Sequence, residues 1–96
     1  MVERTLLVTA RLGLHARAAA KVVRVAQGFI SRMELRRVDN EVTADAKSIL
    51  SVLMLAASRG TELHVIVEGV DEEAALSAID RLFADGFGER EQESPG

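Results

Sequence analysis

His15 is the residue of this chain whose position best suits chemistry. It follows Gly13 and precedes a stretch with helical periodicity, so it occupies a predicted helix entrance. The first turn of a helix leaves backbone N–H groups without intrahelical partners, here those of Ala16, Arg17 and Ala18. These groups form the positive end of the helix dipole, which attracts an anion and favours a neutral imidazole beside it. A neutral ring leaves one nitrogen available as a nucleophile.

The guanidinium of Arg17 adds a charge-assisted donor that matches the oxygens of a phosphate. His15, Arg17 and the backbone after them therefore predict a phosphoryl acceptor whose product is stabilised by the helix terminus. On spacing alone, a histidine that merely caps a helix is the commoner case, and that alternative stays open at this point. Gly13 is the only glycine near His15, so no nucleotide-binding loop is present, and the phosphoryl group should come from a protein.

Ser48 opens a second segment of interest and suits the N-cap position of a helix. The residues after it, from 49 to 57, are apolar nearly all round, whereas a short helix on a sheet buries one face. We therefore expect part of this helix to stay exposed as a partner-docking surface, formed by Leu50 and Leu53 and partly by Ile49. We expect Val52, Met54 and Leu55 to be shared between core and rim. The alternative is a helix that is buried on all sides.

Other polar residues are better explained by structure. His64 lies in the middle of a predicted strand, and nothing pairs it with His15 as a metal ligand. Asp71 suits a helix N-cap, and the acidic residues 72 and 73 follow it at the positive end of the same helix. We expect no metal site and no cofactor.

The elements that must position His15 follow from periodicity. Alternating residues predict strands at Val2–Thr9, around Met33 to Arg36, around Val42 and at Glu62–Glu68, the second and third joined as a hairpin. Helical spacing predicts helices at Ala16–Gln27, Ser48–Ser58 and from Asp71 to near Gly86. Because the strands are amphipathic, the helices should cover one face of a mainly antiparallel sheet, and this is an α+β fold.

Length and composition fit a single soluble domain. The chain has 96 residues, 48% of them hydrophobic and 28% charged, and a formal charge of −3. The absence of cysteine excludes disulfides, zinc fingers and thiol chemistry. No basic block or set of stacking aromatics indicates nucleic-acid binding, and no leader or roughly 18-residue apolar run indicates a membrane. We expect a cytoplasmic protein with one domain at 1–87 and a flexible polar tail at 88–96 without chemistry.

Three stretches together resemble the HPr family, the histidine-containing phosphocarriers of the phosphoenolpyruvate-dependent sugar phosphotransferase system. They are LHARAAAKVV, AKSILSVLMLAASRG and EGVDEEAALSAIDRLF, and the resemblance runs from about Thr5 to Gly88. It implies an open-faced β-sandwich of four strands and three helices in the order βαββαβα. It also implies that His15 takes a phosphoryl group from phosphorylated enzyme I and passes it to IIA components of sugar transporters, with Arg17 as the active-site arginine.

The resemblance also assigns a role to Ser48, which matches the family's regulatory serine, phosphorylated in some bacteria by HPr kinase/phosphorylase. The apolar residues after Ser48 would then dock enzyme I and IIA. Two positions depart from the family pattern: Ala18 replaces a proline, and Leu12 replaces a polar residue. The family role implies a carrier rather than an enzyme, and a monomer. The alternatives are a regulatory binding module that acts through Ser48 and its apolar patch, and a generic ligand- or RNA-binding domain.

Overall fold

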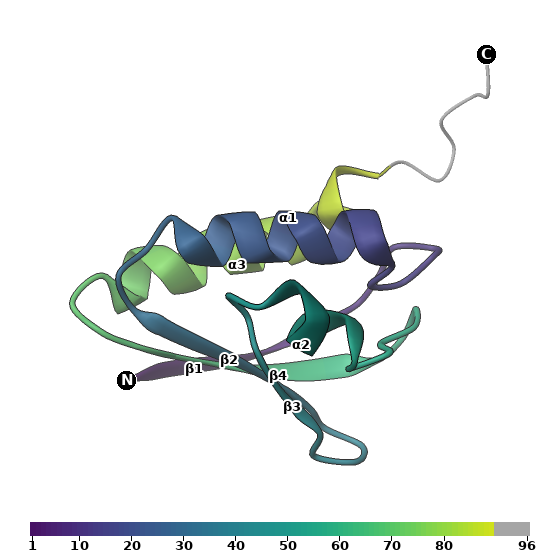
Figure 1. Ribbon diagram of the computed structural model, residues 1–96, viewed down its shortest axis with the longest axis horizontal. Coiled ribbons are helices and arrows are strands. Elements are labelled where there is room, and N and C mark those ends of the chain that lie inside the picture. Colours follow the sequence, from purple (N-terminus) through teal and green to yellow (C-terminus); the bar gives the residue numbers. More distant parts are fainter. Residues whose placement is uncertain (90–96) are drawn as a thin grey trace.

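The computed structural model describes residues 1–89, and these fold as an open-faced sandwich of one sheet and three helices (Figure 1). The strands are β1 (Val2–Leu7), β2 (Arg32–Arg37), β3 (Thr43–Asp45) and β4 (Glu62–Glu68). The helices are α1 (Ala16–Gln27), α2 (Ile49–Leu53) and α3 (Glu72–Ala84), followed by the 3₁₀ turn η1 (Gly86–Gly88). The predicted α+β class and βαββαβα order are confirmed.

The sheet has the strand order β1-β4-β2-β3, and every neighbouring pair is antiparallel. The three helices lie on one face of it, with α1 and α3 side by side (Figure 1). Alternation along the strands explains this arrangement: in β4, Leu63, Val65 and Val67 are buried, while the residues between them face the open side. The apolar stripes of α1 and α3 complete the core, and Phe83 at its edge is nearly fully buried.

The strand expected over Val2–Thr9 ends at Leu7, and two further predictions differ from the structure. The helix expected over Ser48–Ser58 ends at Leu53, because the backbone reverses at Ala56, which has a positive φ of 51°. Asp71 occupies the N-cap position of α3, yet its side chain makes no capping bond there. Its carboxylate instead accepts hydrogen bonds from the backbone N–H groups of Ile30 and Ser31, both at 2.9 Å, and from the Ser31 hydroxyl. These hydrogen bonds lower the pKa of Asp71.

None of the helices within residues 1–89 is long and apolar enough to cross a bilayer. The longest of them, α3, has 13 residues and buries only one face against the sheet.

Candidate functional site

A tight loop before α1 sets the position of His15. Gly13 has a φ of 67°, and a Cβ there would lie 2.6 Å from the carbonyl oxygen of Ala57. Leu14 is buried, and its N–H donates to that same carbonyl oxygen at 2.8 Å. The close approach therefore requires a glycine, and the loop after α2 holds the residue next to His15.

The two ring nitrogens of His15 face different partners. Nδ1 accepts a hydrogen bond from the backbone N–H of Arg17 at 3.3 Å, so the predicted capping role is confirmed. Nε2 lies 2.5 Å from a carboxylate oxygen of Glu89, and the imidazole is 27% exposed. A nitrogen that accepts a hydrogen bond carries no proton, so these contacts select the neutral tautomer with its hydrogen on Nε2. The lone pair of Nδ1 then points at the helix terminus.

The first turn of α1 offers donors and no competing carboxylate. The first intrahelical hydrogen bond runs from Ala19 N–H to the His15 carbonyl, so the N–H groups of Ala16, Arg17 and Ala18 precede it. No acidic residue stands in this turn. Arg17 is exposed at the same end of the helix, whereas Ala18 is fully buried against the core. The structure thus places the Arg17 N–H at Nδ1 of His15 and leaves Ala16 and Arg17 exposed at the helix entrance, whereas the buried Ala18 is not accessible to a ligand.

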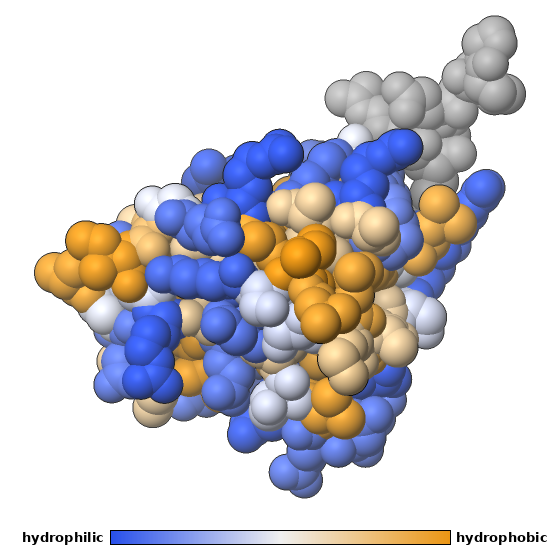
Figure 2. Space-filling view, in the orientation of Figure 1, coloured by the Kyte–Doolittle hydropathy of each residue, from blue (hydrophilic) through white to orange (hydrophobic). Residues whose placement is uncertain are grey.

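The α2 segment is partly exposed, as the sequence predicts. Leu50 is 66% exposed, Ile49 and Leu53 are exposed to a lesser degree, and Val52 is buried. The expectation that Val52, Met54 and Leu55 are shared between core and rim is wrong: Val52 and Leu55 are buried, whereas Met54 is 70% exposed. Met54 follows Leu50 by one helical turn and therefore shares its solvent face. Figure 2 shows hydrophobic side chains gathered over α2. We call Ile49, Leu50, Leu53 and Met54 the α2 patch.

Ser48 is the N-cap of α2, as predicted: its Oγ accepts from the N–H of Ser51 at 3.3 Å. The hydroxyl is therefore engaged in a local bond at the edge of the α2 patch.

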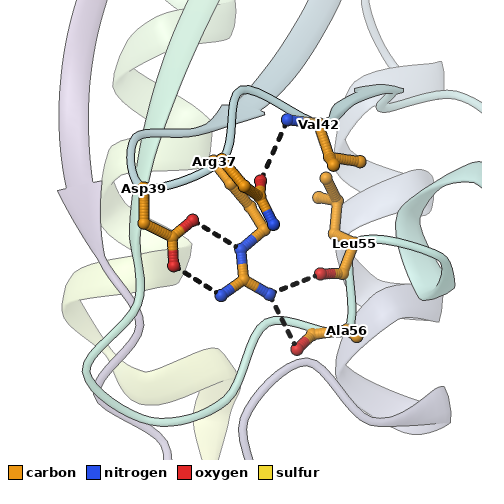
Figure 3. Close-up of polar contacts among 6 residues, drawn as sticks. Arg37, Asp39, Val42, Leu55 and Ala56 are labelled. Carbon is orange, nitrogen blue, oxygen red and sulfur yellow. Dashed lines mark hydrogen bonds and ion pairs between the residues drawn. The ribbon is translucent and has the colours of Figure 1, made fainter.

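Arg37 is a supporting residue that the sequence analysis missed. Its guanidinium pairs with Asp39 at 2.9 and 2.7 Å and donates to the carbonyls of Leu55 and Ala56 at 2.8 and 3.2 Å (Figure 3). The hydrogen bonds and opposite charges of the two side chains raise the pKa of Arg37 and lower the pKa of Asp39. Arg37 therefore fixes the turn after α2, which in turn supports the His15 loop. The parity of β2 could have revealed it, since Arg37 shares the helix-side face with Leu35.

Glu89 is the second residue that the sequence analysis missed. The tail predicted for 88–96 was expected to carry no chemistry, but Gly88 ends η1 and Glu89 contacts His15. The physical reason is that Phe87 is fully buried, with its ring centroid 5.0 Å from that of Phe83, so the chain is held against the domain up to this point. The remainder of the predicted tail, 90–96, lies outside the described residues.

His64 lies away from this site, on the open face of the sheet. Its Nε2 is 2.5 Å from Glu3, and its Nδ1 is 3.1 Å from the hydroxyl of Thr5. Both partners come from the neighbouring strand, as cross-strand contacts do. In residues 1–89, no group of three or more histidine, cysteine, aspartate or glutamate side chains is arranged to hold a metal ion.

Comparison with known proteins identifies what this arrangement is similar to. The family model described as the PTS HPr component phosphorylation site matches residues 2–85. The phosphocarrier protein HPr of Treponema pallidum is 48% identical over 89 residues, which are 93% of this chain and 99% of that protein. The phosphocarrier protein NPr of Escherichia coli K12 is 40% identical over 92% of this chain and 97% of its own length.

Solved structures agree with the sequence relatives. The crystal structure of HPr-C-His from Thermoanaerobacter tengcongensis superposes with a TM-score of 0.88 at 36% identity, covering 94% of this chain and 99% of that one. A phosphocarrier protein HPr from Bacillus anthracis superposes with a TM-score of 0.80 at 32% identity, over 85% and 95% of the two chains.

Proposed function

The chain belongs to the HPr family of phosphocarrier proteins, and we propose that His15 is the residue on which it carries the phosphoryl group. The observation that carries this proposal is the orientation of the imidazole. Its Nδ1 lone pair faces the first turn of α1, and its Nε2 is held by a carboxylate. A phosphoryl group on Nδ1 would meet backbone donors, the positive helix end and the Arg17 guanidinium.

The transfer is a direct substitution at phosphorus. The Nδ1 lone pair forms a bond to the phosphorus atom of a phosphorylated donor protein, while the bond from phosphorus to the donor breaks and its electron pair stays on the donor. The reverse chemistry delivers the group to an acceptor, so the protein is returned unchanged and works as a carrier. We propose phosphorylated enzyme I as the donor and IIA components as acceptors, with a monomer working in the cytoplasm.

The α2 patch is the proposed docking surface for both partners. Its side chains are exposed and apolar, which is typical of the centre of a protein interface. Ser48 begins the same segment, and a phosphate there would add about two negative charges to this apolar surface. We therefore propose that phosphorylation of Ser48 by HPr kinase/phosphorylase, in a cell that has that kinase, weakens partner docking.

The test is phosphorylation by enzyme I and labelled phosphoenolpyruvate. The intact protein should acquire acid-labile, base-stable label, and H15A should acquire none. H64A is the matched control, since it removes the other histidine and should keep full labelling. Absence of label on the intact protein with every enzyme I tested, or undiminished label on H15A, would refute the proposed role of His15.

A further inference from the structure

The contact between Glu89 and His15 extends the site beyond the residues named so far. The two side chains come from opposite ends of the described chain and meet at 2.5 Å. Both are largely shielded, with 27% of the His15 side chain and 21% of the Glu89 side chain exposed. A carboxylate that accepts from one imidazole nitrogen fixes both the tautomer and the orientation of the ring.

The backbone before Glu89 is anchored, and these tertiary contacts fix the position of the Glu89 carboxylate. The buried ring of Phe87 packs on Phe83, and Lys21 of α1 donates to the Phe87 carbonyl at 2.7 Å. The N–H of Glu89 itself donates to the carbonyl of Gly86 at 3.0 Å. Lys21 lies on the same helix that His15 caps, so α1 holds both η1 and the imidazole in place.

From this geometry we propose that Glu89 is a positioning residue for phosphoryl transfer. Its carboxylate holds the hydrogen on Nε2 of His15 and thereby directs the Nδ1 lone pair to the helix entrance. This inference rests on the proposed function of His15.

Glu89 also acts on the product. When Nδ1 bonds to phosphorus while Nε2 keeps its hydrogen, the ring becomes an imidazolium, with a positive charge shared by the two nitrogens. The Glu89 carboxylate accepts a charge-assisted hydrogen bond from Nε2–H and offsets that charge, while the phosphoryl oxygens face the donors of α1. The carboxylate therefore favours the phosphorylated state as well as the attacking tautomer.

The variants E89A, E89Q and E3A separate this role from a structural one. E89A removes the acceptor, and E89Q keeps an amide oxygen that can accept from Nε2–H but carries no charge. E3A is the matched control, because Glu3 makes the same 2.5 Å contact with Nε2 of His64. Each variant is compared with the intact chain by its melting temperature, which should stay near the original value for E89A and E89Q.

Two measurements then test whether Glu89 positions His15 for transfer. Long-range ¹H–¹⁵N NMR should show the Nε2–H tautomer of His15 in the intact chain, a mixed population in E89A, and no change at His15 in E3A. Single-turnover transfer from phosphorylated enzyme I should slow about three- to tenfold in E89A and less in E89Q, the range expected for a partly exposed charged hydrogen bond. An unchanged tautomer or an unchanged transfer rate in E89A overturns the proposal.

The tautomer measurement needs no enzyme I, so it tests the role of Glu89 separately from the proposed function of His15. If the intact protein accepts no phosphoryl group, the proposed function fails. In that case the NMR spectrum of E89A still shows whether Glu89 sets the His15 tautomer.

Discussion

The helix entrance around His15 and the open sheet face around His64 contain the same pair of side chains in different surroundings. In each, a glutamate oxygen lies 2.5 Å from Nε2 of a half-buried imidazole. At His15 the other nitrogen faces a backbone N–H at the start of α1, whereas at His64 it faces the hydroxyl of Thr5 within the sheet. The carboxylate orients a ring in both places, but the helix entrance adds backbone N–H groups that have no intrahelical partner and can donate to an incoming phosphate.

The comparison shows why a histidine–carboxylate pair is not by itself a functional site. A strand contributes no net dipole of comparable size, and its N–H groups are used in the ladder. The cation nearest in register to His64 is Arg36, which lies opposite it on β2, but the strand around His64 offers no row of free backbone N–H groups. At His15 the backbone N–H groups before the first intrahelical hydrogen bond lie at the helix end, and Arg17 is exposed at the same end.

Substituting Gly13 should have the largest effect on the His15 site. In G13A the new Cβ would lie 2.6 Å from the Ala57 carbonyl oxygen, at a φ of 67°. We expect a loss of stability of about 2–3 kcal/mol and a large loss of phosphoryl acceptance, because the loop that presents His15 must shift. Urea unfolding and transfer kinetics measure the two effects.

Gly60 is the matched control for Gly13. It has a φ of 92°, but a Cβ there meets nothing within 4 Å. G60A should lose only about 1 kcal/mol, the cost of backbone strain alone. Equal losses for the two variants would mean that the close approach at Gly13 carries no energetic weight.

Removing Arg17 should give a smaller effect that is confined to transfer. Its exposed guanidinium contributes little to the core, so R17A should unfold like the intact chain. Phosphoryl acceptance should fall about tenfold, since a charge-assisted donor to phosphate is lost. R24A on the same helix serves as the control and should transfer normally; a tenfold loss in that variant too would point to general basic charge instead of a phosphate contact.

The smallest effect concerns acid stability, which arises at the Asp71 contacts with Ile30 and Ser31. Because these hydrogen bonds lower the folded-state pKa of Asp71, its contribution is complete above the ordinary value of 3.8 and is lost as the pH falls below it. The D71N variant should therefore melt lower than the intact chain near pH 7 and lose less on acidification below about pH 4. Melting temperatures between pH 7 and pH 2.5 measure this.

Glu73 provides the control for that profile, since it lies exposed in the first turn of the same helix. E73Q should keep the acid profile of the intact chain. A D71N profile parallel to that of the intact chain would contradict the assignment of acid sensitivity to Asp71.

Periodicity predicted the strands, the three helices and the helix-covered face, because burial of one face leaves a clear pattern in each element. Local sequence also located the N-caps His15 and Ser48, whereas the phosphate-binding role of Arg17 stays a prediction. The α2 segment is shorter than predicted because the reversal at Ala56 depends on tertiary contacts, among them the bond from Arg37 to its carbonyl. Composition alone did not reveal that reversal.

Glu89 was missed for a related reason. A polar, glycine-containing stretch near a chain end gives no periodic pattern, and a single phenylalanine, Phe87, anchors it. The contact with His15 joins residues 74 positions apart, so no local motif could indicate it. Long-range side-chain pairs of this kind become visible only in the folded structure.

The most direct test of phosphoryl transfer to Nδ1 of His15 is to locate the phosphoryl group on the intact protein. The ¹⁵N-labelled chain, phosphorylated by enzyme I and kept at alkaline pH, can be examined by ³¹P and ¹⁵N NMR. The orientation of His15 predicts phosphorus bonded to Nδ1 of His15, with hydrogen retained on Nε2. Phosphorus on Nε2 of His15, or on His64, would contradict it.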